Sequence, residues 1–134
     1  MTPLRFSEIC EEFISKEQEI LNWKRKEYSP QDDRLQNFRE IAALTGTSMP
    51  QVALTYLLKH IQSIKNAVMT GNVDWCWEGE GGEGMKQRIA DSRNYLLLLA
   101  ACLDEEAVTN ATVTDVCIAE RPEEKRSVGR ESQD

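Results

Sequence analysis

The sequence predicts an all-α fold of four helices followed by a polar C-terminal tail. Apolar residues recur at helical spacing along four segments, and proline, glycine or a capping serine separates those segments. The chain of 134 residues is 40 % hydrophobic and 29 % charged. This balance is typical of a globular domain, and the length is sufficient for one hydrophobic core.

The first helix is expected to begin at Ser7 and to end near Tyr28. Ser7 is a good N-cap, and glutamates follow it in the first turn, where the helix dipole favours negative charge. Ser29-Pro30 ends the segment, because proline disfavours helical geometry in the residue before it. The side chains expected to face inward are those of Ile9, Phe13, Ile20 and Trp23.

The second helix is expected from Asp32 or Asp33 to Leu44, with Gly46 as its C-terminal stop. Its inward residues are predicted to be Leu35, Phe38, Ala42 and Leu44.

The third helix has the clearest start signal in the sequence. Ser48, Pro50 and Gln51 form a capping box with a proline in the first turn, and the helix should continue to about Met69. Its broad apolar face is typical of a central helix that is contacted from two sides. That face comprises Val52, Leu54, Tyr56, Leu57, Ile61, Ile64 and Val68.

A Gly/Trp-rich loop is expected between Gly71 and Gly84, because five glycines and four acidic residues interrupt the pattern there. The fourth helix then runs from near Met85 to about Glu106. Its segment 95–103 is apolar nearly all round, which predicts burial on more than one side.

The composition changes near residue 108, so the sequence predicts a helical bundle over residues 1–107 and a different region over 108–134. Residues 108–118 are rich in β-branched side chains and are expected to form an extended arm. Residues after Glu120 are charged and nearly free of large apolar groups, so a mobile tail is expected.

Charge and composition exclude several classes of protein. A net charge of −7 argues against general nucleic-acid binding, which depends on neutralising phosphates. The longest apolar run is half the length needed to cross a bilayer, and residues 1–5 lack the pattern of a signal peptide. The four cysteines include no Cys-x-x-Cys pair and are expected to be reduced thiols. We therefore expect a cytoplasmic protein.

Few segments carry recognisable chemistry. The glycine-rich loop lacks the Lys-Ser/Thr ending of a phosphate-binding P-loop, and a single histidine, His60, supports no nucleophilic triad. Trp75 and Trp77 either fold back onto the core or form a lid that stacks on a planar base. On the fourth helix, Asp91, Asn94 and Tyr95 share one face. A carboxylate at the rim of an apolar helix is costly unless it pairs with a basic residue or binds a cation.

Four stretches, in this order, resemble those of small phage proteins similar to the MazG-like all-α nucleotide pyrophosphohydrolases and to phage nucleotide-modification-associated domains. They are residues 24–28, 33–38, 58–64 and 91–99, and the resemblance covers about residues 7–104. It implies a four-helix MazG-like bundle, a homodimer or higher homo-oligomer, a nucleotide pocket lined by helices, and a location in the host cytoplasm if the protein is phage-encoded.

The same resemblance implies acidic residues on facing helices that hold magnesium. This chain departs from that pattern, with Gln87 and Arg88 where a glutamate is expected, and with Lys59, His60 and Gln62 in place of a Glu-x-x-Glu pair. Basic side chains could contact phosphate directly. A nucleotide-binding or nucleotide-sequestering protein is therefore expected. The alternatives are a Mg²⁺-dependent pyrophosphohydrolase and an interaction protein without a small ligand.

The candidate site is expected where these helix faces converge. Asp91 is the candidate metal ligand, or else it pairs with Lys59. The candidate ligand-binding residues are Arg34, Asn37, Lys59, His60, Ser63, Arg88, Asn94, Tyr95, Trp75 and Trp77.

Overall fold

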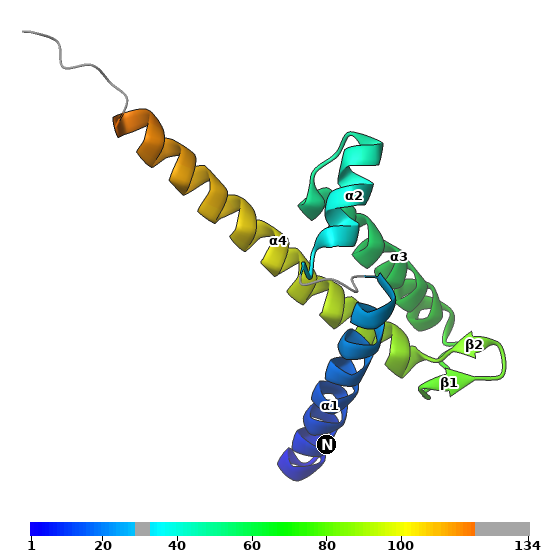
Figure 1. Ribbon diagram of the computed structural model, residues 1–134. Coiled ribbons are helices and arrows are strands. Elements are labelled where there is room, and N and C mark those ends of the chain that lie inside the picture. Colours follow the sequence, from blue (N-terminus) through cyan, green and yellow to red (C-terminus); the bar gives the residue numbers. More distant parts are fainter. Residues whose placement is uncertain (29–32, 120–134) are drawn as a thin grey trace, which may run out of the picture. The chain divides into compact units, whose positions relative to one another are not determined.

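The described residues form four helices and one short β-hairpin, so the all-α prediction is confirmed (Figure 1). A computed structural model describes residues 1–28 and 33–119, with side chains up to residue 113. The helices are α1 (Pro3–Tyr28), α2 (Gln36–Thr45), α3 (Met49–Thr70) and α4 (Met85–Ala119). Strands β1 (Glu78–Gly79) and β2 (Gly82–Glu83) pair antiparallel between α3 and α4. No helix among these residues is long and apolar enough to cross a membrane.

The chain divides between Asp104 and Glu105 into two compact units, and α4 contains residues of both. The prediction of an extended arm over residues 108–118 is wrong, because these residues are helical. The hydroxyls of Thr109 and Thr112 donate to the carbonyls four residues earlier, at 2.9 and 3.0 Å. Such bonds satisfy the hydroxyls of β-branched threonines within a helix. The predicted tail after Glu120 lies outside the described residues.

Helix α1 begins four residues before the predicted cap at Ser7. The Thr2 hydroxyl accepts a hydrogen bond from the amide of Arg5 at 3.2 Å. Pro3 occupies the first helical position, where a backbone N–H would have no acceptor within the helix. The side chains of Phe13, Glu17 and Ile20 are buried. Trp23 is 62 % exposed, contrary to prediction, because the inward stripe continues to Lys24 instead.

Helix α2 begins at Gln36 and not at Asp33; Asp32, the other predicted start, lies outside the described residues. The Asp33 side chain accepts from the amide of Leu35 at 3.0 Å, so this residue forms a turn before the helix. Gly46 ends the helix with φ of 65°, as predicted. Leu44 is 87 % exposed, contrary to prediction, because the inward face is set by residues four apart, Phe38 and Ala42.

Helix α3 has the predicted capping box, since Ser48 and Gln51 exchange hydrogen bonds between side chain and backbone. Its burial is one-sided, however. The buried residues are Met49, Val52, Ala53 and Leu57, whereas Leu54, Ile61 and Val68 are 43–61 % exposed. The expectation of contacts on two sides is therefore wrong for the described residues.

The buried apolar side chains form two clusters, and α4 contributes to both. One cluster joins α2, α3 and α4 around Phe38, Ala53 and Cys102, and the other joins α1 and α4 around Phe13 and Ala90. The segment 95–103 is not buried all round, because Leu96, Leu97 and Leu103 are more than half exposed.

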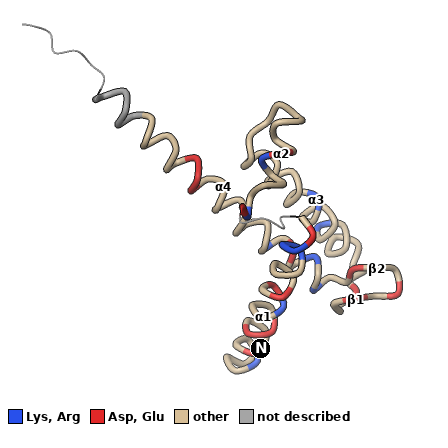
Figure 2. Tube along the Cα trace, in the orientation of Figure 1, with Lys and Arg blue, Asp and Glu red and all other residues tan. Residues whose placement is uncertain are grey.

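The segment between α3 and α4 is more ordered than an irregular loop, because its backbone caps α4. The carbonyls of Asp74 and Cys76 accept from the amides of Met85 and Lys86, at 2.8 and 3.1 Å. A Cβ on Gly84 would lie 2.1 Å from the Cys76 carbonyl oxygen, so only glycine permits this close approach. All charged side chains of residues 78–84 are acidic (Figure 2).

Candidate functional site

A cavity of about 290 Å³ lies between α1, α2, α3 and α4. Its volume is near the lower end for small-molecule pockets, which span about 300–1,000 Å³. The apolar and aromatic lining residues are Leu21, Tyr28, Phe38, Ile41, Tyr56, Tyr95 and Leu98, and the polar ones are Lys24, Arg25, Arg34, Asn37, Asp91 and Asn94. The cavity thus brings together five of the predicted site residues: Arg34, Asn37, Asp91, Asn94 and Tyr95.

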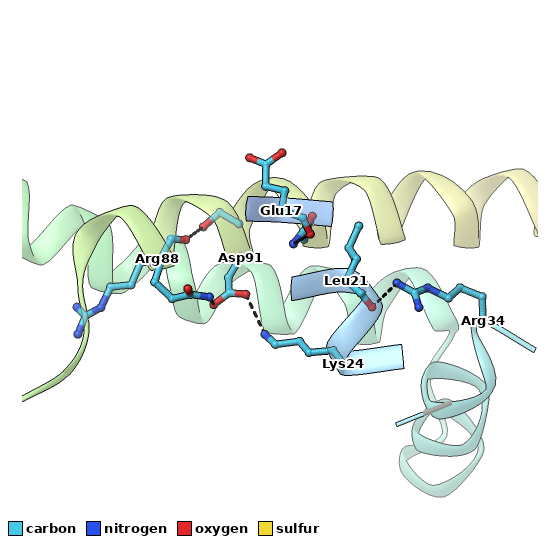
Figure 3. A network of polar contacts seen from close by, with 9 residues as sticks. Glu17, Leu21, Lys24, Arg34, Arg88 and Asp91 are labelled. Carbon is cyan, nitrogen blue, oxygen red and sulfur yellow. Dashed lines mark hydrogen bonds and ion pairs between the residues drawn. The ribbon is translucent and has the colours of Figure 1, made fainter. Parts of the chain in front are cut away.

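Asp91 is 1 % exposed, and both of its carboxylate oxygens accept hydrogen bonds (Figure 3). Lys24 Nζ donates to Oδ1 at 2.8 Å, and Gln87 Nε2 donates to Oδ2 at 3.2 Å. The basic partner is therefore Lys24 of α1 and not Lys59, the alternative considered from the sequence. Lys59 follows the buried Leu57 by two positions, which turns its side chain to the exposed face of α3.

The charge of Lys24 is stabilised by this pairing. Burial has the largest influence on the pKa of Lys24 and lowers it, but the hydrogen bond and charge of Asp91 together raise that pKa above its ordinary value. Lys24 is therefore a fixed cation at the cavity wall at neutral pH.

Two arginines add positive charge to the same cavity. Arg34 Nη2 donates to the backbone carbonyl of Leu21 at 3.0 Å (Figure 3). Burial lowers the pKa of Arg34, and the nearby positive charge of Arg25 lowers it further. The lining carries three basic side chains and one acidic side chain, which is opposite in sign to the whole chain. Local charge of this kind attracts anions even to an acidic protein.

Asn94 contributes a buried hydrogen-bond acceptor. Its Nδ2 donates to the backbone carbonyl of Glu17 at 3.2 Å, and because a carbonyl can only accept, the orientation of the amide is fixed. Asn94 Oδ1 has no hydrogen-bond partner among the described residues. An unsatisfied buried acceptor costs about 1–3 kcal/mol, so this lining residue is suited to a ligand that carries a donor.

An aromatic stack extends from the cavity wall to the histidine. Tyr95 stacks on Tyr56 at 5.7 Å and on His60 at 5.4 Å between ring centroids. Burial lowers the pKa of His60, although the charges of Asp91 and Glu83 oppose this effect. The imidazole is therefore neutral at pH 7, and it lies beside the cavity without lining it.

Two other predicted residues, Ser63 and Arg88, lie apart from the cavity. Arg88 Nη1 donates to Ser63 Oγ, and both residues line a separate shallow depression with Asn66 and Thr70. The structure thus brings these two residues together but does not join them to Arg34 or Asn94.

The tryptophans lie against α1. Trp77 packs on Phe13, with 5.1 Å between ring centroids, and its Nε1 donates to Glu12 Oε1 at 2.9 Å. Trp75 lies 6.3 Å from Phe13 and is 51 % exposed. This arrangement corresponds to the alternative in which the indoles fold back onto the helices, and their role as a ligand-binding lid stays a prediction.

Three residues that line the cavity or lie near Asp91 are absent from the sequence-based site: Lys24, Arg25 and Glu83. A signal for Lys24 exists, because it continues the stripe of Phe13, Glu17 and Ile20 at helical spacing. A charged residue on a core-facing stripe indicates a buried partner. Glu83 has no such signal, because its position depends on the fold of the hairpin.

Comparisons with known protein families, with characterised proteins and with solved structures found no match for this chain. We therefore infer function from the side chains that surround the cavity and from their chemistry.

Proposed function

We propose that this protein binds a nucleotide in the cavity between its four helices, as a MazG-like protein that holds its ligand without magnesium. The observation that carries the proposal is the lining of the cavity. Three basic side chains lie beside a mostly apolar and aromatic wall in a chain of net charge −7. A phosphate group matches the first feature, and a planar base matches the second.

The lining residues have separate roles in this proposal. Arg25 and Arg34 contact the phosphate, for which the planar guanidinium provides a fork of donors. Tyr56 and Tyr95 pack against the base, and Asn94 Oδ1 accepts a hydrogen bond from the base or the sugar. The volume of about 290 Å³ favours a single mononucleotide over a dinucleotide.

Magnesium fits these residues poorly. Mg²⁺ requires near-octahedral oxygen ligands, and Asp91 is the one carboxylate in the lining of the cavity. We therefore favour binding over Mg²⁺-dependent pyrophosphohydrolysis, which the resemblance also implies.

The test is a thermal-shift and calorimetric screen of deoxynucleoside monophosphates and triphosphates against the full chain, with and without Mg²⁺. We expect stabilisation by one class of base without release of pyrophosphate; a ligand at 100 times its Kd adds about 2.7 kcal/mol. Arg25→Ala should weaken binding, whereas Lys26→Ala should not, because the exposed neighbour Lys26 is outside the cavity lining. Mg²⁺-dependent release of pyrophosphate would favour the enzyme, and no stabilisation by any nucleotide would refute both.

A second proposal concerns assembly. Leu54, Ile61 and Val68 are spaced seven residues apart on α3 and are exposed. An apolar stripe with this period is typical of a helix that packs on another helix. We propose that it is covered in a homodimer or higher homo-oligomer. Sedimentation should show a mass above that of the 15.3 kDa chain at micromolar concentration, and Ile61→Glu should return it to a monomer.

A further inference from the structure

A second group of side chains lies beside the cavity and shares Asp91 with it. His60 of α3, Glu83 of β2 and Asp91 of α4 each offer one ligand atom, and these atoms all lie within 4.8 Å of one another. The three residues come from three elements, and they lie 23 and eight positions apart in the sequence. Their approach therefore results from the tertiary fold and not from local spacing.

The three groups are close but are not bonded to each other. Among the described residues, no hydrogen bond joins His60, Glu83 and Asp91, and no ion pair within 4.0 Å engages the Glu83 carboxylate. Hydrogen-bonded atoms lie about 2.7–3.2 Å apart. Atoms that share one metal ion at about 2.0–2.2 Å each are separated by no more than about 4.4 Å, so a spacing of up to 4.8 Å requires a small closure of the three side chains around the ion.

The ring of His60 is positioned as a metal ligand would be, because one of its nitrogens lies within 4.8 Å of an oxygen of the Glu83 and Asp91 carboxylates. The stack on Tyr95 limits rotation of the ring. Both ring nitrogens are without a hydrogen-bond partner in the described part of the chain, so neither is committed elsewhere.

We propose that His60, Glu83 and Asp91 bind one divalent transition-metal ion, of the class that accepts mixed nitrogen and carboxylate ligands, such as Mn²⁺. The imidazole of His60 favours a transition-metal ion over Mg²⁺, which prefers oxygen ligands alone, and the two carboxylates suit Mn²⁺. The inference stands on this cluster and does not depend on nucleotide binding in the neighbouring cavity.

Lys24 limits the affinity of the site. Its ammonium group lies 2.8 Å from Asp91 Oδ1, and a cation bound to the same carboxylate is repelled by it. Replacing Lys24 by an uncharged side chain should therefore strengthen metal binding, although it removes a positive charge from the nucleotide cavity. Substitution of Lys24 is thus expected to strengthen metal binding and to weaken nucleotide binding.

The test is a titration of the metal-free full chain with Mn²⁺. The electron paramagnetic resonance signal of the free aqua ion measures the unbound Mn²⁺ at each step. We expect one bound Mn²⁺ per chain that equimolar Mg²⁺ does not displace. Glu83→Gln preserves shape at an exposed position and should weaken binding at least about tenfold, as should His60→Gln. Glu80→Gln, on the same hairpin but outside the cluster, is the matched control and should bind as the parent does.

Each outcome decides the proposal. Loss of binding in Glu83→Gln but not in Glu80→Gln, with tighter binding in Lys24→Met, supports it. No binding at millimolar Mn²⁺, or equal affinity in both glutamate variants, overturns it. Thermal unfolding of each metal-free variant verifies the fold, and nucleotide binding by Glu83→Gln shows separately whether the cavity proposal holds.

Discussion

Two of the charged networks that connect α1 with α4 differ in what they leave unsatisfied. Near the N-terminal half of α1, Glu12 accepts from Lys86 Nζ at 2.7 Å and from Trp77 Nε1 at 2.9 Å. The donor atoms there have partners, and Lys86 Nζ also lies over the Trp77 ring, 5.8 Å from its centroid. Farther along α1, Lys24 pairs with the buried Asp91 beside a cavity and beside Asn94, whose Oδ1 is unpaired among the described residues. A satisfied network stabilises a fold, whereas unsatisfied groups around a cavity indicate a ligand.

The largest expected effect is a difference between the two networks in the unfolding free energy lost when the lysine of each is replaced. Lys24→Met leaves the carboxylate of Asp91, which is 1 % exposed, without its cation, and loss of a buried partner costs about 3–5 kcal/mol. Lys86→Met should cost less, because the Glu12 side chain is 35 % exposed and water can solvate it. Urea denaturation measures both values, and equal losses would contradict the distinction drawn between the networks.

A smaller effect tests the structural role of Trp77. Trp77→Phe retains a ring against Phe13 but removes the N–H that Glu12 accepts. The free energy of unfolding should fall by about 1 kcal/mol, the net value of one hydrogen bond. Nucleotide affinity should be unchanged, as measured by calorimetry. A large loss of affinity with little loss of stability would instead support the predicted lid.

The smallest effect is a difference in pH dependence. Burial lowers the pKa of His60 in the folded chain, so the unfolded chain takes up a proton first, and stability should decline as pH falls below about 6.5. The hydrogen bond from Lys86, followed by that from Trp77, lowers the pKa of Glu12. Its contribution is therefore present above pH 4.5 and is lost as pH falls further. Denaturation of His60→Gln from pH 7 to 5 should lack the first decline, and persistence of that decline would assign it to another group.

The sequence was sufficient for features governed by local chemistry. The capping box at Ser48, the stop at Gly46 and the shared face of Asp91 and Asn94 follow from side chains within a few residues of one another. Features that depend on tertiary packing were not predictable in the same way. The pairing of Asp91 with Lys24 requires the register of α1 against α4, and the position of Glu83 requires the hairpin.

The predictions that the structure contradicts also concern features that depend on more than the local pattern of residue types. Trp23 and Leu44 are apolar and were placed inward, but the buried stripe of each helix is fixed by its neighbours in space. The β-branched segment after residue 107 was predicted to be extended, yet the hydroxyls of Thr109 and Thr112 find acceptors within the helix. Propensity is a weak guide where such local bonds are available.

The close contact between Gly84 and the Cys76 carbonyl gives the hairpin a fixed origin. Glu83 is the residue immediately before this contact, so its carboxylate takes its position from the first turn of α4, the helix that also carries Asp91. A methyl group at residue 84 would separate the two backbones and displace Glu83 from His60 and Asp91 without altering any of the three. Gly84 thus helps to keep the Glu83 and Asp91 carboxylates close together, and substitution at this position would disturb the proposed metal site before it altered the cavity.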